Sequence, residues 1–401
     1  MSLIVTDFQH FQSKNIVKLE LSQQQQEARS KFKQFVDREI IPFADEFDRQ
    51  ESIPKKTIEK LARQGYFGAL LPPKYGGTQM ESIAYGLLNE EVARGSASLH
   101  SLLVVYGMVT SALLRWGSRS QKGFWLPKFA AGEAVPGFCL SEVNAGSDTQ
   151  SMETIAIPVE GGYVLKGHKR WSSYGQIADV FLVFARCEGK PTAFLVESDR
   201  PGLSRKPISG MVGMKSAMLA QVFLDDCWIP AENQVGQPGF GLSYIAYTAL
   251  DTARYNVAWG SVGIARAALE ACLEYTNERQ QFGDRLKEYQ LIQQMITEMV
   301  VKVKAARLLC YQAGYLREIG TPESIMETLI AKYFASTAVT KITTDAVQIH
   351  GAYGCSGESP VQRYWRDAKI MEIVEGSTQL LQTMIPEYGE REYRQQSDAS
   401  K

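Results

Sequence analysis

The pattern of hydrophobic and polar residues divides the chain into a helical, a β-rich and a second helical part. From Ser22 to about residue 131, apolar residues recur at helical spacing, for example Phe32, Phe35 and Val36. Ser22 and Gln25 stand three positions apart and can form a capping box at the start of the first helix. Proline and glycine breakers interrupt the pattern further on. This part is therefore predicted to be a bundle of about five helices.

The character of the chain changes between about residues 135 and 239. Short runs rich in β-branched and aromatic residues alternate there with clusters of Gly, Pro, Asp and Lys. The predicted strands cover residues 154–159, 162–167, 179–185, 192–197 and 220–225. These runs predict a small all-β domain.

Helical periodicity returns from Gly241 to about Tyr388. The predicted helices cover residues 241–276, 286–318 and 322–349, with a shorter one after Gly376. We expect an N-terminal extension and four further parts, in the order N-terminal helical domain, middle β domain, C-terminal helical bundle and polar, flexible tail: 1–19, 20–133, 134–240, 241–388 and 389–401. An order of helices, strands and helices is unusual and is the first specific clue.

Composition excludes several classes of partner. Lys plus Arg number 43 and Asp plus Glu number 44, which gives a net charge of -1 and no sign of a polyanion-binding surface. No apolar run approaches the roughly 20 residues of a membrane helix, and the first residues lack the pattern of an export signal. We expect a soluble protein with no nucleic-acid partner and no membrane partner.

Cysteine and histidine usage argues against metal and disulfide chemistry. The six cysteines are scattered without any C-x-x-C spacing, which favours a reducing cytoplasm over a disulfide framework. None of the four histidines belongs to an H-x-x-x-H or H-E-x-x-H pair. We therefore expect no metal site.

Four polar clusters remain as candidates for chemistry, since the chain has neither a G-x-S-x-G elbow nor a P-loop. They cover residues 138–148, 169–179, 278–286 and 366–379. Each has an ordinary structural explanation: a strand and turn, a core tryptophan, a solvated loop, and an acid, Glu375, that caps a helix. Four such clusters in one chain are harder to explain in this way.

The four clusters, in this order, resemble the acyl-CoA dehydrogenase superfamily, and the resemblance covers residues 20–388. The family motif T-E-P-x-A-G-S-D corresponds to 141-SEVNAGSD-148, W-[IL]-T-N-G to 171-WSSYG-175, and R-x-x-F-G to 279-RQQFG-283. Further agreement lies in 213-GMKSA-217, 224-LDDCWIP-230, 348-QIHGAYG-354 and 366-RDAKIMEIVEGSTQ-379. The resemblance implies a mostly α fold with a central β domain: an N-terminal helical bundle, a middle β-barrel and a C-terminal four-helix bundle.

The resemblance also implies FAD as cofactor and a homodimer or homotetramer. It places Ser141 near the pyrimidine edge of the flavin and Trp171 with Ser173 against the ring. Other residues would hold the adenosine and pyrophosphate end of an FAD bound to a neighbouring subunit: Arg279, Phe282, Gln348 and Gly351. Four more belong to the implied FAD site, the last two touching the FAD of the same subunit: Cys139, Ser147, Ser377 and Gln379.

The implied reaction removes two hydrogens from the carbons next to an acyl thioester. Glu375 would take the α-proton while flavin N5 accepts the β-hydride. Its apolar neighbours Ile373 and Val374 would raise its pKa. Some branches place the base just before the position of Arg254, but that residue is Ala253 here. The implied substrate contacts come from four residues: Ser147, Arg254, Val374 and Gly376.

Three departures from the family pattern bear on the substrate. Val143 replaces a proline, Tyr174 an asparagine, and Val374 an aromatic residue before the base. Three runs instead resemble the branch that oxidises acyl groups on an acyl carrier protein to make hydroxymalonyl or aminomalonyl units for polyketides and nonribosomal peptides: residues 99–108, 253–267 and 364–377. We therefore expect a small acyl group, with desaturation and alcohol oxidation both open.

Other functions fit the same residues. The first alternative is a short- or branched-chain acyl-CoA dehydrogenase of catabolism, which would pass electrons to an electron-transferring flavoprotein. The second is a flavin oxidase or oxygenase on the same fold. A non-catalytic scaffold is disfavoured, because the flavin motifs and the base are both present.

Overall fold

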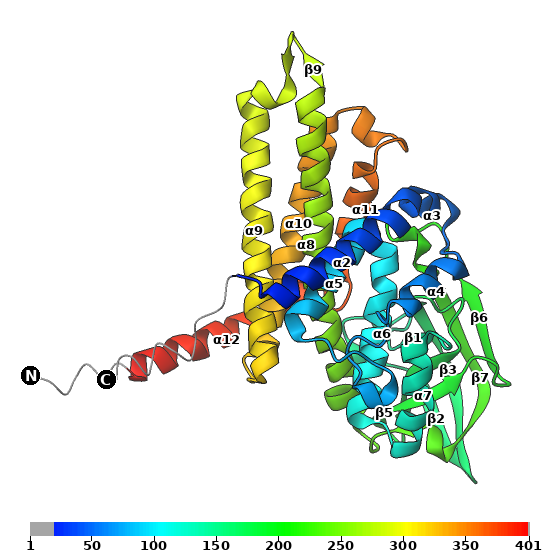
Figure 1. Ribbon diagram of the computed structural model, residues 1–401. Coiled ribbons are helices and arrows are strands. Elements are labelled where there is room, and N and C mark those ends of the chain that lie inside the picture. The colour runs from blue at the N-terminus through cyan, green and yellow to red at the C-terminus, as the bar shows by residue number, and fades with distance from the viewer. Residues whose placement is uncertain (1–19, 400–401) are drawn as a thin grey trace, which may run out of the picture.

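The computed structural model describes residues 20–399, and the side chains among them through residue 391. The expected extension, residues 1–19, lies outside the described residues. Helices, then a sheet, then helices follow one another along the chain, as the sequence predicts (Figure 1). The long helices of the C-terminal part extend away from the β domain, so the two ends of this helical part lie in different surroundings (Figure 1).

The N-terminal part begins at the capping box expected at Ser22. The Ser22 hydroxyl accepts from the Gln25 backbone N–H at 3.2 Å, and the Gln25 side chain accepts from the Ser22 N–H at 2.9 Å. The helices of this part are α2 (Gln23–Glu39), α3 (Ala44–Gln50), α4 (Lys55–Arg63), α5 (Ser82–Gly95), α6 (Ala97–Trp116) and α7 (Arg119–Ala131). The bundle thus has more helices than the periodicity indicated, because short α3 and α4 each hold too few apolar positions to show a repeat.

Helix α6 is the core helix of the molecule. Ala97–Trp116 is long and apolar enough to cross a membrane, but 83% of its most apolar window is buried inside the protein. It packs against α5, α8 and the first strand of the β domain. A helix that is apolar on all sides is expected at such a central position.

The β domain is one mixed sheet with strand order β6-β7-β3-β2-β4-β5-β8, and β1 pairs in parallel with β4. Its strands are β1 (Pro136–Cys139), β2 (Ile155–Val159), β3 (Gly162–Ser172), β4 (Val180–Cys187), β5 (Lys190–Glu197), β6 (Leu203–Pro207), β7 (Ala220–Pro230) and β8 (Gln234–Val235). Strand β1 corresponds to the strand expected at the start of the cluster 138–148, whereas β6, which is mostly exposed, and β8, which has two residues, were not predicted. Strands β6 and β8 are edges in this sheet, so the expected barrel is an open sheet among the described residues.

The position of strand β4 accounts for its uninterrupted run of apolar residues. Val180, Leu182 and Phe184 belong to the large hydrophobic core that the helices share. Phe181 and Val183 point the other way into a separate core of the β domain. Because both faces of β4 are buried, the strand shows no alternation of polar and apolar residues.

The C-terminal part contains α8 (Tyr247–Glu278), α9 (Gln290–Ile319), α10 (Ser324–His350), α11 (Val361–Ile373) and α12 (Thr378–Ala399), with a hairpin of β9 (Gln280–Gln281) and β10 (Asp284–Arg285) between α8 and α9. Helix α12 continues to Ala399, whereas a flexible tail was expected from residue 389. Polar composition alone does not end a helix, and Gly389 is tolerated within it at a modest cost.

Helices α5 and α8 approach each other unusually closely. A Cβ atom at Gly86 would lie 2.2 Å from Cε2 of Trp259, so only glycine fits there. A buried ionic cluster reinforces the same contact: Glu90 bonds Arg266 and Arg307 at 2.6 Å each, and Glu91 bonds Arg266 at 2.7 Å. These contacts join the N-terminal helices to the C-terminal bundle.

Candidate active site

Glu375 lies in the short connection between α11 and α12. Its backbone φ is 58° and that of Gly376 is 111°, so two consecutive residues are left-handed. Such a conformation is unfavourable for a glutamate and persists only where surrounding contacts enforce it. Contacts with neighbouring residues must therefore hold this loop in its conformation.

Two buried cations hold this loop by its backbone. Arg254 Nε donates to the Glu375 carbonyl at 2.9 Å. Lys332 Nζ donates to the Gly376 carbonyl at 2.7 Å and to the Glu372 carbonyl at 3.4 Å. The two cationic residues are 6% and 0% exposed. The structure thus places Arg254 beside Glu375, and the Nε of Arg254 donates to the backbone carbonyl of that residue.

The surroundings of Glu375 favour a carboxyl group that gains and loses a proton near neutral pH. Burial raises its pKa from the ordinary value to about 7, although the positive charges of Arg254 and Lys332 act in the opposite direction. Val374 packs against the helical core, in keeping with the expected apolar setting. A carboxylate with this pKa is suited to remove a proton at neutral pH.

The first two sequence clusters lie side by side in the β domain. Lys169 and Glu142 form a buried ion pair with an Nζ to Oε1 distance of 2.6 Å. The Arg170 N–H donates to the Ser141 carbonyl at 2.9 Å. The Glu142 carboxylate also accepts from the backbone N–H groups of residues 153 and 154. Glu142 is therefore a structural residue that fixes the loop carrying Ser141.

The residues expected around the flavin ring have exposed or unbonded groups that could contact such a ring. Trp171 is 45% exposed, with a left-handed φ of 68°, and the Arg170 guanidinium covers one face of its indole at 4.4 Å. The hydroxyls of Ser141 and Ser173 make no hydrogen bond within residues 20–399. An open aromatic wall with nearby free hydroxyls suits a flat, polar-edged isoalloxazine.

Cys139 and Ser147 lie at the two ends of the same segment in different surroundings. The Cys139 thiol is buried and donates to the Ser172 hydroxyl at 3.6 Å, and burial raises its pKa to about 12. Ser147 is exposed next to Gly146, around which there is open space. Only Ser147 is thus free to meet a ligand through its side chain in this structure.

Ser377 and Gln379 lie at the start of α12, directly after the base. The Ser377 hydroxyl accepts from the Leu380 N–H at 3.3 Å, so it caps this helix. Gln379 is exposed. Both residues therefore lie close to Glu375, which precedes them by two and four positions in the sequence.

The remaining expected FAD residues lie at the other end of the C-terminal bundle. Phe282, at the tip of the β9–β10 hairpin, is 96% exposed, and Arg279 is exposed at the end of α8. Tyr275 near that end stacks on His350 at 4.3 Å, which places Gln348 and Gly351 at the same end. Figure 1 shows this end far from the β domain.

The three departures from the family pattern differ in their surroundings. Val143 is 56% exposed. Tyr174 is completely buried and its hydroxyl donates to the Ser98 carbonyl of α6 at 2.7 Å. Tyr174 therefore joins the β domain to α6, and it has no exposed surface to offer to an acyl group.

Two residues that the sequence did not single out shape the site. Lys332 is one, and its only signal is a lysine within the apolar run 328-TLIAKYFA-335. The other is Asp367, whose Oδ1 accepts from the Met214 N–H at 2.6 Å and whose pKa burial raises to about 6. This bond connects the loop 213-GMKSA-217 to α11 and explains why both segments carry a recognisable pattern.

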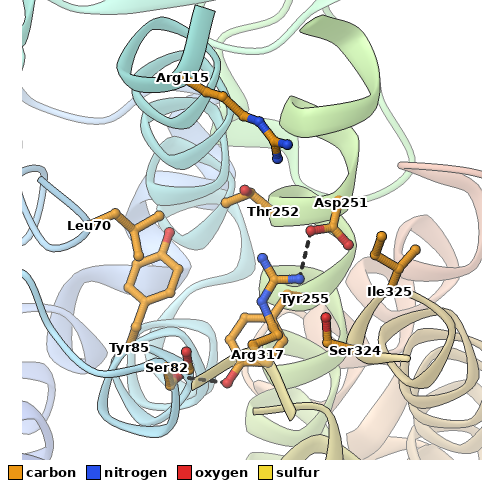
Figure 2. A pocket seen from close by; sticks show the side chains of 10 residues that line it. All are labelled: Leu70, Ser82, Tyr85, Arg115, Asp251, Thr252, Tyr255, Arg317, Ser324 and Ile325. Atoms are coloured by element: carbon orange, nitrogen blue, oxygen red, sulfur yellow. Dashed lines mark hydrogen bonds and ion pairs between the residues drawn. The ribbon is translucent and has the colours of Figure 1, made fainter. Parts of the chain in front are cut away.

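A separate pocket of about 300 Å³ opens between the two helical parts (Figure 2). Arg317 pairs there with Asp251 at 2.7 Å, and the Tyr255 hydroxyl donates to the Ser82 carbonyl at 2.7 Å. None of the site residues expected from the sequence lines this pocket. In the part of the chain that the structure describes, no group of three His, Cys, Asp or Glu side chains is arranged to hold a metal ion.

Comparison with known families matches the chain along almost its whole length. Residues 22–133 match the model described as "Acyl-CoA dehydrogenase, N-terminal domain", residues 137–227 the middle domain and residues 239–388 the C-terminal domain. The glutaryl-CoA dehydrogenase of Desulfococcus multivorans is 35% identical over 376 residues, which cover 91% of this chain and 96% of that protein.

Solved structures agree with this match. The glutaryl-CoA dehydrogenase of Mycobacterium smegmatis in complex with FADH2 has a TM-score of 0.88 and 26% identity, covering 92% of this chain and 95% of that one. The prolyl acyl carrier protein oxidase AnaB has a TM-score of 0.88 and 26% identity, covering 92% and 99%.

Proposed function

This chain belongs to the acyl-CoA dehydrogenase family and is an FAD-dependent oxidoreductase, and from that premise we propose that it dehydrogenates a small acyl thioester with Glu375 as the catalytic base. The observation that carries this proposal is the Glu375 loop. The pKa of its carboxyl group is raised to about 7, and two buried cations hold the backbone of the loop by its carbonyls. Bound FAD would supply the acceptor for a hydride.

Residues of the chain have distinct parts in this reaction. Glu375 removes the proton from the carbon next to the thioester carbonyl, and a double bond forms as a hydride leaves the adjacent carbon. The backbone N–H of Glu375 forms no hydrogen bond within the described residues and is free to donate to the thioester carbonyl. Trp171, Ser141 and Ser173 would hold the ring of the cofactor.

We propose a carrier protein, rather than CoA, as the usual bearer of the acyl group, in the biosynthesis of a polyketide or nonribosomal peptide. The sequence runs 99–108, 253–267 and 364–377 support this, as does the likeness to an oxidase whose name includes an acyl carrier protein. The likeness to glutaryl-CoA dehydrogenases supports the alternative, a CoA ester of catabolism. Ser147, Arg254, Val374 and Gly376 remain the proposed substrate contacts.

The bearer of the acyl group can be tested directly by flavin bleaching. The purified protein is mixed without oxygen with glyceryl, seryl and butyryl groups, each as a CoA ester and as a thioester on an acyl carrier protein. We expect bleaching with the carrier thioesters to be at least about tenfold faster. Faster bleaching with the CoA esters would contradict the carrier assignment alone. A protein that binds no FAD, or whose flavin no thioester bleaches, would contradict the dehydrogenase assignment.

A flavin oxidase is the second candidate, since the solved relative AnaB is named an oxidase. The same reactions repeated in air distinguish the two. A dehydrogenase yields little peroxide and passes electrons to an electron-transferring flavoprotein, whereas an oxidase yields about one peroxide for each product formed. Stoichiometric peroxide would therefore favour the oxidase.

We also propose that the protein is a homodimer or homotetramer in the cytoplasm. The exposed hairpin residue Phe282 and the α9 residues Leu291 and Val301, 72% and 60% exposed, give the C-terminal bundle an apolar surface. Arg279, Gln348 and Gly351 would then meet the FAD of a neighbouring subunit. The cysteines are all unpaired, as in a reducing compartment.

Replacing Phe282 with aspartate is expected to weaken FAD binding at least about tenfold and to shift the oligomer towards smaller species, because this exposed phenylalanine would be buried against the neighbouring subunit in the proposed assembly. The ratio of flavin to protein absorbance and light scattering measure the two effects. Phe124→Asp, at a residue of α7 that is 54% exposed, serves as control. Unchanged FAD affinity and mass in Phe282→Asp would refute the shared site.

A further inference from the structure

Lys332 is a completely buried lysine in the middle of α10. Its neighbours along the helix include Leu329, Ala331 and Ala335, which are also buried. An ammonium group in such surroundings is unfavourable unless it is compensated by charges or hydrogen-bond acceptors. The partners of Lys332 therefore indicate why a lysine is present.

Those partners are backbone carbonyls on both sides of the base. The Glu372 carbonyl, 3.4 Å from Nζ, belongs to the last turn of α11, and the Gly376 carbonyl, at 2.7 Å, follows Glu375. Carbonyls at the end of a helix lack partners within the helix and carry a partial negative charge. The Lys332 ammonium thus caps the C-terminal end of α11. It also binds a carbonyl on each side of Glu375 and so fixes both ends of this segment.

The charged groups around Glu375 come from three helices. Helix α8 contributes Arg254, with Asp251 and Tyr247 beyond it, and α10 contributes Lys332. Helix α11 contributes Glu372, whose carboxylate accepts from the Thr340 hydroxyl at 2.6 Å. Glu375 therefore faces two positive groups, one of which, Arg254, also binds its carbonyl.

We propose that Lys332 is a positioning residue of the reaction: it holds the backbone from Glu372 to Gly376 in the conformation that presents Glu375, and its charge stabilises the Glu375 carboxylate. This inference rests on the function proposed above and goes beyond it. Lys332 acts through Glu375 and not through the substrate. A neutral side chain of equal length would fill the space but would serve neither purpose.

The charges of the two groups favour each other. Burial lowers the pKa of Lys332 and raises that of Glu375, whereas the Glu375 carboxylate raises the pKa of Lys332 and the Lys332 ammonium lowers that of Glu375. Removing the positive charge would raise the pKa of Glu375 further, so that the base would become active only at higher pH.

The test compares Lys332→Met and Lys332→Gln, which remove the charge, with Lys332→Arg, which keeps it. Lys302→Met on α9 serves as the control, since Lys302 pairs only with Glu298 there. The rate of anaerobic flavin reduction is measured from pH 5 to about pH 9 with whichever of the six thioesters reduces the parent fastest. Hydrogen exchange of the peptide containing residues 372–377, FAD content and thermal unfolding are measured on the same holoproteins.

In Lys332→Met and Lys332→Gln the pKa that governs the acidic limb of the pH–rate profile is expected to rise by about one unit, which lowers the rate near pH 7 about fivefold. Exchange in residues 372–377 is expected to be faster. Lys332→Arg restores the position of the limb, and Lys302→Met matches the parent. Should the methionine variant fail to fold, the smaller and polar glutamine variant decides the question.

A folded neutral variant with the parent pH profile and the parent exchange rate would overturn the role of Lys332. Glu375→Gln, measured alongside, separates this outcome from failure of the proposed function. If Glu375→Gln is inactive while the Lys332 variants keep the parent profile, only the inference about Lys332 is wrong. If Glu375→Gln keeps the parent activity, the proposed base itself is wrong.

Discussion

Replacing Glu375 with glutamine is expected to slow flavin reduction by an acyl thioester about 10²- to 10⁴-fold. Glutamine has nearly the same shape but no basic carboxylate, so the proton next to the thioester has no acceptor. Arg254 and Lys332 bind only backbone carbonyls of this loop, and their bonds persist in the variant. Anaerobic stopped-flow spectroscopy at the flavin absorbance band measures the rate.

The FAD content of this variant should equal that of the parent, because no residue expected to bind the cofactor is changed. Glu160→Gln, at an exposed position after β2, is the matched control and should keep the parent rate. In the parent, the rate should rise with pH through the Glu375 pKa of about 7, since only the deprotonated base acts. A Glu375→Gln protein that reduces its flavin at the parent rate would remove Glu375 from the reaction.

Replacing Glu90 with glutamine is expected to lower the free energy of unfolding by about 3 kcal/mol. Glu90 is completely buried in α5 and pairs with Arg266 and Arg307, with Arg29 at 3.7 Å. Removing its charge leaves these guanidinium groups without their shared counterion in the interior, which is more costly than losing an exposed pair. Urea-induced unfolding of the holoprotein measures the change.

The acid dependence of this stabilisation supplies a second measurement. The guanidinium groups of Arg307 and Arg266 counteract the burial of Glu90 and keep its pKa below the ordinary value. The stabilisation is then fully present above the pKa of an unfolded glutamate, about 4.3, and is lost as the pH falls further. The difference between parent and variant should therefore shrink in acid. Glu298→Gln, which breaks only an exposed pair, should leave the midpoint unchanged.

Periodicity predicted most of the fold because its signals are local. The helix start at Ser22 and the strands β2 and β5 follow from capping and from runs of apolar residues, and all three are present. Helix α11 was missed as a separate element, because its sequence is read as part of a motif and its boundary depends on the left-handed residues after it. The edge strand β6 was missed because its side chains are mostly exposed, and β8 because it has only two residues.

The candidate site likewise contains some residues that local sequence patterns predict and others that they do not. Trp171, Ser141 and Glu375 could be predicted as candidates because each lies in a pattern that can be recognised along the chain. Lys332 was not found, since its partners are backbone carbonyls 40 and 44 residues away, which no local pattern encodes. Tyr174 was interpreted from its position beside the flavin motif, but its hydroxyl reaches a carbonyl of α6. Such long-range contacts depend on the packing of the whole chain.

Strand β4 has a consequence for how the protein loses its structure. Three of its side chains, Val180, Leu182 and Phe184, complete the core of the helices, although the strand belongs to the β domain. The sheet cannot separate from the helices without exposing these side chains and the helical core that they complete. The boundaries between the three family domains along the chain are therefore not boundaries between cooperative units, and sheet and helices should melt in a single transition.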